Sequence, residues 1–91
     1  MAMLAALPAQ ADAENVAAPP IAGRCVACHG ADGIGKAPQY PNLAEQKAAY
    51  MVKQMRAFRS GERQDPWMSA MARSLTDEEI TALATWFAAL R

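Results

Sequence analysis

Cysteine, histidine, aromatic residues and net charge are all scarce in this sequence. It contains two cysteines, one histidine and equal numbers of acidic and basic side chains, nine of each. A formal net charge of zero argues against a general affinity for nucleic acid or for an anionic membrane surface. No apolar run approaches the roughly 18 residues that a membrane-spanning helix needs. We therefore expect no transmembrane segment, and partners that recognise a local patch of the surface.

The chain is short, and it lacks both internal repeats and the alternating apolar pattern of β-strands. With 91 residues it forms one domain at most. A domain of this size buries a modest fraction of its surface and often depends on a metal, a disulfide or a cofactor. The sequence therefore predicts helices and loops, completed by a bound group.

The first thirteen residues differ in composition from the rest. A short apolar stretch at residues 3–7 is followed by two overlapping small-x-small sequences in residues 9–13, as at the end of a secretory signal peptide. The first basic residue is Arg24, so the usual positive start of such a peptide is missing. The alternative is an alanine-rich disordered tail. On both interpretations residues 1–13 lie outside the folded domain, which we expect at 14–91, and a signal peptide would direct the protein to the periplasm.

Helical patterns separated by loops account for the middle of the chain. A short first helix is expected to begin at Pro19 and Pro20 and to run into the cysteines, because proline is tolerated at the start of a helix. Glycines and prolines make residues 30–42 an irregular loop. Apolar residues at helical spacing predict an amphipathic helix over residues 44–60, ended by Gly61.

The C-terminal part contains a loop, a short turn and the most clearly marked helix. Residues 61–68 are expected to form the loop and residues 69–73 the helical turn. Thr76 and Glu79 form a capping box, in which the hydroxyl and the carboxylate satisfy free N–H groups at the start of a helix. The residues after it place one apolar face on a final helix: Ile80, Leu83, Ala84, Phe87 and Leu90.

Both cysteines and the histidine lie within five residues, Cys25-Val26-Ala27-Cys28-His29. A disulfide across this spacing closes too small a loop to stabilise much. A redox dithiol of the thioredoxin kind needs a strand–helix–strand pattern, and a zinc site needs a fourth ligand. The spacing C-x-x-C-H is typical of c-type haem attachment, with two thioethers and an axial histidine. We favour haem, and zinc and a dithiol remain the alternatives.

The second axial ligand of such a haem has to come from another residue type, since His29 is the only histidine. Methionine is the obvious candidate, and its thioether raises the reduction potential of a haem. Of the six methionines, two lie in the N-terminal segment and two on the amphipathic helix, where methionine more often fills a core. Met68 and Met71 remain. Of these two, Met68 is favoured because it lies in the expected loop.

The C-x-x-C-H-G motif is followed by three further patterns in a familiar order. These are Pro41-Asn42-Leu43, the series Tyr50, Gln54, Phe58, Gly61 and Arg63, and the segment MSAMARSLTDEEITALATWF. With these features residues 22–90 resemble a class I cytochrome c, most closely one domain of the tandem two-haem bacterial cytochromes c or a single-haem relative. The resemblance implies an all-α cytochrome c fold, with three to four helices around one covalent haem c. It places the methionine ligand seven residues before Leu75, at Met68.

The resemblance also implies roles for other residues around the haem. Pro41 would accept a hydrogen bond from the His29 ring. The pocket would include Tyr50, Phe58 and Met71, and a propionate would lie near Arg63, Gln54 or Trp67. Trp86 and Phe87 are expected to pack against the first helix, although Pro19 and Pro20 make that helix shorter than in most of the family.

An iron with two protein ligands has no open position, so the resemblance implies a one-electron carrier between redox proteins and not an enzyme. The exposed haem edge would be surrounded by Val26, Ala27 and Ile34. A basic region would favour an acidic partner face: Lys36, Lys47, Lys53, Arg56, Arg59 and Arg63. Three alternatives remain, namely a haem subunit of a larger dehydrogenase or oxidase complex and, if the methionine is labile, a peroxidase or a gas sensor. As a carrier we expect a monomer.

Overall fold

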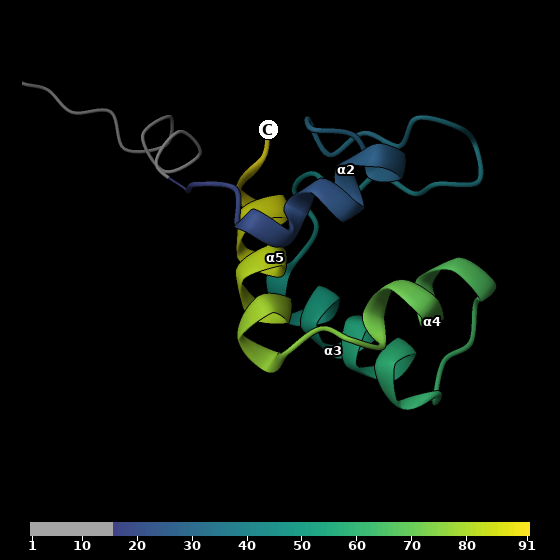
Figure 1. Ribbon diagram of the computed structural model, residues 1–91. Coiled ribbons are helices and arrows are strands. Elements are labelled where there is room, and N and C mark those ends of the chain that lie inside the picture. The colour runs from purple at the N-terminus through teal and green to yellow at the C-terminus, as the bar shows by residue number, and fades with distance from the viewer. Residues whose placement is uncertain (1–15) are drawn as a thin grey trace, which may run out of the picture.

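Four α-helices and one 3-10 turn make up the regular structure of residues 16–91, which this computed structural model describes (Figure 1). In chain order they are η1 (Pro20–Ala22), α2 (Gly23–His29), α3 (Ala48–Ser60), α4 (Pro66–Ala72) and α5 (Asp77–Ala89). The described residues contain no strand, which confirms the all-α prediction. The segment 1–13 expected to precede the domain lies outside the described residues.

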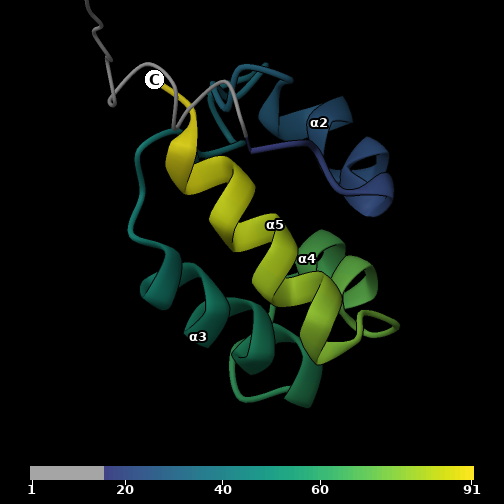
Figure 2. The ribbon, with the colours of Figure 1, turned by 90° about the vertical axis from the view of Figure 1, so that its left-hand side faces the viewer.

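Helix α5 is the element around which the others pack. It contacts α3 and η1, while α4 packs on α3 and η1 continues into α2. In Figure 1, α2 and α4 both extend to the same side of α5, and Figure 2 shows α5 in front with α3 beside it. Five of the ten buried apolar residues among those described belong to α5: Ile80, Leu83, Ala84, Trp86 and Phe87. The predicted apolar face of this helix is therefore the centre of the core, and Leu90 packs against it at the margin.

The start of α3 differs from the prediction. The helix begins at Ala48, four residues later than expected, because a turn comes first: Gln46 N–H donates to Leu43 O and Glu45 has a φ of 65°. A non-glycine residue in the left-handed region ends any regular helix. Gly61 ends α3 as predicted, in the left-handed conformation with a φ of 88°.

The loop predicted at residues 61–68 ends earlier than expected. Helix α4 begins at Pro66, so Met68 lies on a helix and not in a loop, and the turn expected at 69–73 is the second half of α4. The Asp65 carboxylate accepts hydrogen bonds from Trp67 N at 3.0 Å and from Met68 N at 2.8 Å. Aspartate as N-cap followed by proline at the first position is a helix start signal. That signal was present in the sequence and was missed.

The capping box of α5 is present as predicted. Thr76 Oγ1 accepts from Glu79 N at 3.0 Å, and Thr76 N donates to Glu79 Oε1 at 3.0 Å. A cap of this kind contributes about 1 kcal/mol to helix stability.

Asp77, the first residue of α5, joins this helix to α3 through two arginines. Its Oδ1 lies 2.6 Å from Arg59 Nη2 and 3.6 Å from Arg56 Nε. Arg59 also donates to Leu75 O at 3.0 Å. The hydrogen bond from Arg59, its charge and the charge of Arg56 lower the pKa of Asp77 below its ordinary value of 3.8.

The replacement Asp77→Asn is expected to remove a contribution to the stability that requires the ionised Asp77 carboxylate and is therefore lost in acid. Because the pKa of Asp77 is lower in the folded chain than in the unfolded chain, the contribution is complete above pH 4 and is lost as the pH falls through the folded value. The pair is exposed, so we expect a loss of a few degrees at most in the thermal midpoint at neutral pH. Thermal unfolding from neutral to strongly acidic pH measures it. The curves of the two proteins should converge in acid, whereas Glu78→Gln, an acid in the same turn, should keep the wild-type profile.

Candidate functional site

Helix α2 presents the two cysteines and the histidine at the surface of the core. Cys25 and Cys28 are three residues apart, so their side chains lie on neighbouring positions of one helix face. Both are free thiols and half-buried. His29 is the last residue of the helix and is 7% exposed. The helix therefore places three side chains of the motif at one end, with the histidine innermost.

The His29 ring is held in one orientation by the following loop. Its Nδ1 lies 2.8 Å from Pro41 O, the partner that the family resemblance implied. A carbonyl oxygen only accepts hydrogen bonds, so Nδ1 carries the proton and Nε2 presents its lone pair. Among residues 16–91 no buried side-chain nitrogen or oxygen lacks a hydrogen-bond partner, and Nε2 makes no hydrogen bond there. The described residues therefore leave the Nε2 lone pair unused, as a metal ligand requires.

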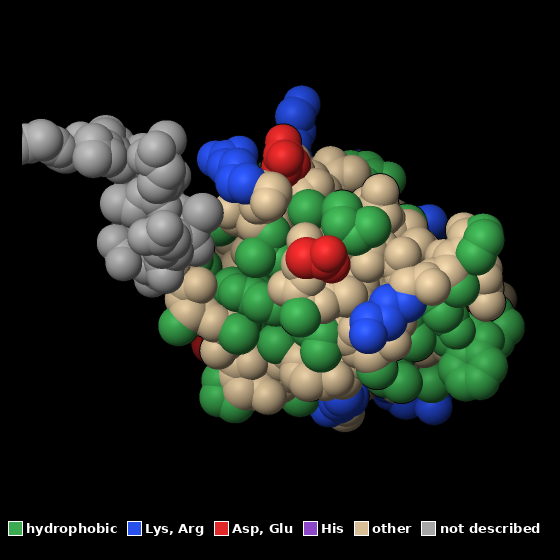
Figure 3. Space-filling model, turned by 90° about the horizontal axis from the view of Figure 1, so that it is seen from above, with side chains coloured by type: hydrophobic (Ala, Val, Ile, Leu, Met, Phe, Trp, Pro, Cys, Tyr) green, Lys and Arg blue, Asp and Glu red, His purple; other side chains and the backbone are tan. Residues whose placement is uncertain are grey.

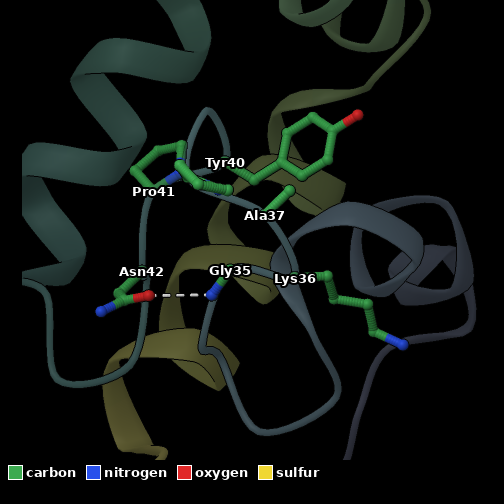
Figure 4. Close-up of a pocket in the computed structure, with 7 residues that line it drawn as sticks. Gly35, Lys36, Ala37, Tyr40, Pro41 and Asn42 are labelled. Atoms are coloured by element: carbon green, nitrogen blue, oxygen red, sulfur yellow. Dashed lines mark hydrogen bonds between the residues drawn. The ribbon is translucent and has the colours of Figure 1, made fainter.

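The loop reaches Pro41 by folding back on α2. Lys36 N donates to Cys28 O at 2.9 Å, and Gly35 N donates to Asn42 Oδ1 at 2.8 Å beside Pro41 (Figure 4). Gly30, directly after His29, has a φ of 85°, and a Cβ there would collide with the Ile34 carbonyl oxygen. Only glycine fits this reversal without strain. The glycine after the histidine thus lets the loop return to it.

Chemistry and geometry both weigh against the alternatives to haem. Within residues 16–91 no three His, Cys, Asp or Glu side chains converge on a point that would hold a metal ion. Burial raises the pKa of the Cys25 thiol, although the charge of Arg24 opposes it. Redox-active thiols of this spacing have a lowered pKa. Two free thiols on one helix face and an adjacent open Nε2 fit the vinyl groups and the iron of haem c.

The two methionines that the sequence singled out both lie on α4. Met68 is half-buried and packs against the core, and its backbone N–H is held by Asp65. Met71 is 38% exposed. Helices α2 and α4, which carry His29 and Met68, extend to the same side of α5 (Figure 1).

The other residues expected near a haem fall into two groups. Phe58 is buried, and Arg63 lies over its ring at 4.6 Å while donating to Gln54 Oε1 at 2.6 Å. Tyr50 and Trp67 are instead 50% and 71% exposed. The structure thus gathers Phe58, Arg63 and Gln54, and leaves the two larger aromatic side chains at the surface.

Phe87 is a site residue whose contact the sequence did not reveal. Its ring meets the His29 ring edge-on, at 6.4 Å between centroids and 71° between planes, and Trp86 packs on Phe87 at 4.8 Å. Packing of α5 against the first helix was expected, and η1, which includes the buried Ala22, does contact α5. A contact with the histidine itself has no local signal, because 58 positions separate the two residues.

The surface around α2 is partly apolar. Ile34 is 47% exposed and Ala27 is also exposed, whereas Val26 is half-buried. Hydrophobic side chains gather in the middle of the face seen from above in Figure 3. Of the six basic residues expected to steer a partner, Arg56 and Arg59 bind Asp77, and Arg63 binds Gln54. Lys36, Lys47 and Lys53 form no ion pair with the described residues and are exposed.

Comparison with known proteins gives one consistent result. A model of the family described as cytochrome c matches residues 13–91. The thiosulfate dehydrogenase electron acceptor of Thiomonas intermedia is 45% identical over 92 residues, covering 100% of this chain and 42% of that protein. Cytochrome c-554(548) of Halomonas halodenitrificans is 46% identical over 68 residues, covering 71% of this chain and 82% of that one. The crystal structure of reduced recombinant cytochrome c4 from Pseudomonas stutzeri superposes with a TM-score of 0.70 at 26% identity, over 100% of this chain and 54% of that one.

The chain spans less than half the length of the first of these relatives and about half of the solved cytochrome c4. In the part of the chain that the structure describes, no helix has the length and apolar character to span a bilayer.

Proposed function

Because this chain belongs to the cytochrome c family and binds covalent haem c, we propose that it is a periplasmic one-electron carrier with His29 and Met68 as axial ligands. Haem c supplies, when bound, an iron that changes between Fe(II) and Fe(III) by one electron. The polypeptide supplies two thioether anchors, Cys25 and Cys28.

The observation that carries the proposal is the His29 ring itself. Its Nδ1–H donates to Pro41 O at 2.8 Å, which fixes the orientation and the tautomer of the ring. Phe87 packs edge-on against the same ring. A buried imidazole that Pro41 O orients, directly after two free thiols, is suited to hold an iron.

Met68 completes the proposed ligand pair. Its thioether is half-buried, and its helix lies on the same side of α5 as α2. A soft sulfur ligand favours Fe(II) and raises the reduction potential. If His29 and Met68 both hold the iron, Ala27 and Ile34 beside the cysteines would offer the exposed apolar surface on which a redox partner could dock.

A sulfur-compound dehydrogenase is the proposed electron donor. The most similar relatives include thiosulfate dehydrogenase electron acceptors from Thiomonas intermedia and Stutzerimonas stutzeri, at 45% and 41% identity over nearly all of this chain. The alternative is an attached haem subunit of such an enzyme. A carrier would pass from the donor to an acceptor in free solution, and a subunit would stay bound during purification.

Reduction by a purified thiosulfate dehydrogenase tests the donor. We expect full reduction of this protein when thiosulfate is added, at a rate that falls roughly tenfold between low and high salt if exposed lysines steer the encounter. Lys36→Gln should lower the rate at low salt, since the Lys36 backbone bonds to Cys28 beside the attachment site. Arg73→Gln is the control for a lost positive charge elsewhere. No reduction would exclude this donor class, and a salt-independent rate would exclude steering.

A further inference from the structure

Arg24 joins the helix that carries the cysteines to the helix that carries Met68. Its Nη1 lies 3.2 Å from Met71 O and 3.2 Å from Ser74 Oγ, across 47 and 50 positions of sequence. Among residues 16–91 these are the hydrogen bonds that connect α2 with residues 66–74. Arg24 directly precedes Cys25, so the connection starts beside the first haem anchor.

Helix α4 packs on α3 and is also held by side chains at both ends. It has seven residues, and a helix of this length is not stable on its own in water. Asp65 holds its beginning by accepting from Trp67 N and Met68 N. At its other end the Met71 carbonyl, which has no partner within so short a helix, accepts from Arg24. Met68 lies between these two attachments, one turn before the carbonyl that Arg24 binds.

The connection after α4 is held from a second direction. Arg59 of α3 donates to Leu75 O at 3.0 Å and binds Asp77. Arg59 therefore fixes the connection to α3, whereas Arg24 fixes it to α2. Only the second link bears on the separation of the two helices that supply the proposed axial ligands.

We propose that Arg24 is a positioning residue for the distal ligand, which holds α4 at the distance from α2 at which Met68 stays on the iron. This inference rests on the proposed assignment of Met68. Without the two hydrogen bonds, α4 would move relative to α2 more often and the sixth position would open more often. The guanidinium suits this role because it donates to two acceptors in a fixed geometry, which a lysine does not.

Carbon monoxide binding to the reduced holoprotein tests the proposal, together with the iron–methionine charge-transfer band of the oxidised form. We expect Arg24→Ala to bind carbon monoxide about tenfold faster, in line with the loss of two hydrogen bonds, and to have a weaker band. Arg24→Lys and Ser74→Ala should fall between Arg24→Ala and the wild type. Arg73→Ala, whose side chain makes no hydrogen bond with the described residues, should behave as wild type. Hydrogen exchange should be faster at residues 72–75 in Arg24→Ala.

The outcomes separate this inference from the ligand assignment. If Met68→Ala loses the band but Arg24→Ala has wild-type carbon monoxide kinetics, the ligand assignment stands and the role of Arg24 is wrong. If Met68→Ala keeps the iron–methionine band, the assignment of Met68 as ligand and the proposed role of Arg24 are both wrong. Equal acceleration in Arg24→Ala and Arg73→Ala would reduce the effect to surface charge and overturn the proposal.

Discussion

Replacing Cys25 and Cys28 together with alanine is expected to leave a chain with no covalent haem and little stable tertiary structure. The domain is small, and its ten buried apolar residues include three alanines, so the polypeptide alone buries little. Haem content by the absorbance of the denatured protein, and helical content by circular dichroism, measure the effect.

The single variants are the controls for this result. Cys25→Ala and Cys28→Ala each retain one anchor and His29, so each is expected to bind haem through one thioether and to fold with reduced stability. A double variant that folds as well as the wild type would show that the fold does not need the cofactor. It would contradict the view that the haem attached through this motif completes the hydrophobic core.

Replacing Met68 with alanine is expected to have the largest effect on the redox properties. The iron–methionine band of the oxidised protein should disappear, and carbon monoxide should bind readily to the reduced protein. The reduction potential should fall by a substantial part of the ~0.8 V range that axial ligands span, because a soft sulfur ligand is lost. Absorption spectra and a potentiometric titration measure these changes.

Met71→Ala is the matched control, three positions along the same helix. Met71 is 38% exposed, and its replacement is expected to leave the band in place and to shift the potential only slightly. The reverse pattern would transfer the ligand role to Met71. Facile carbon monoxide binding by the wild type would instead favour a peroxidase or a gas sensor, because a closed pair of ligands resists it.

Local sequence signals predicted the helices well and their boundaries less well. The capping box at Thr76 and the glycine at position 61 each act through neighbouring residues, and both are present. The start of α3 was misplaced because a turn around Glu45 depends on the loop before it. The start of α4 differs from the prediction because Asp65 caps the helix and Pro66 is its first residue. Met68 lies on a helix, so the argument that favoured it for a position in a loop is wrong. The spacing of seven residues before Leu75, which the family resemblance implies, does not depend on that argument.

The site was predictable where the motif is local and not where it is assembled by the fold. Cys25, Cys28 and His29 follow from five consecutive residues, and the hydrogen bond from His29 to Pro41 follows from the family resemblance and is present. The contacts of Phe87 with His29 and of Arg24 with Met71 join residues far apart in the sequence. No periodicity or motif encodes such pairs. Arg59 was likewise expected to belong to a basic surface that attracts a partner, whereas its guanidinium binds Asp77.

The number of electrons that the purified protein takes up is the most direct test of the central claim. A reductive titration followed by visible absorption should show one electron per chain, with a change from oxidised to reduced haem c spectra in the same step. Two electrons per chain without a visible change would identify Cys25 and Cys28 as a redox dithiol. Uptake of no electrons, with bound zinc, would also contradict the account.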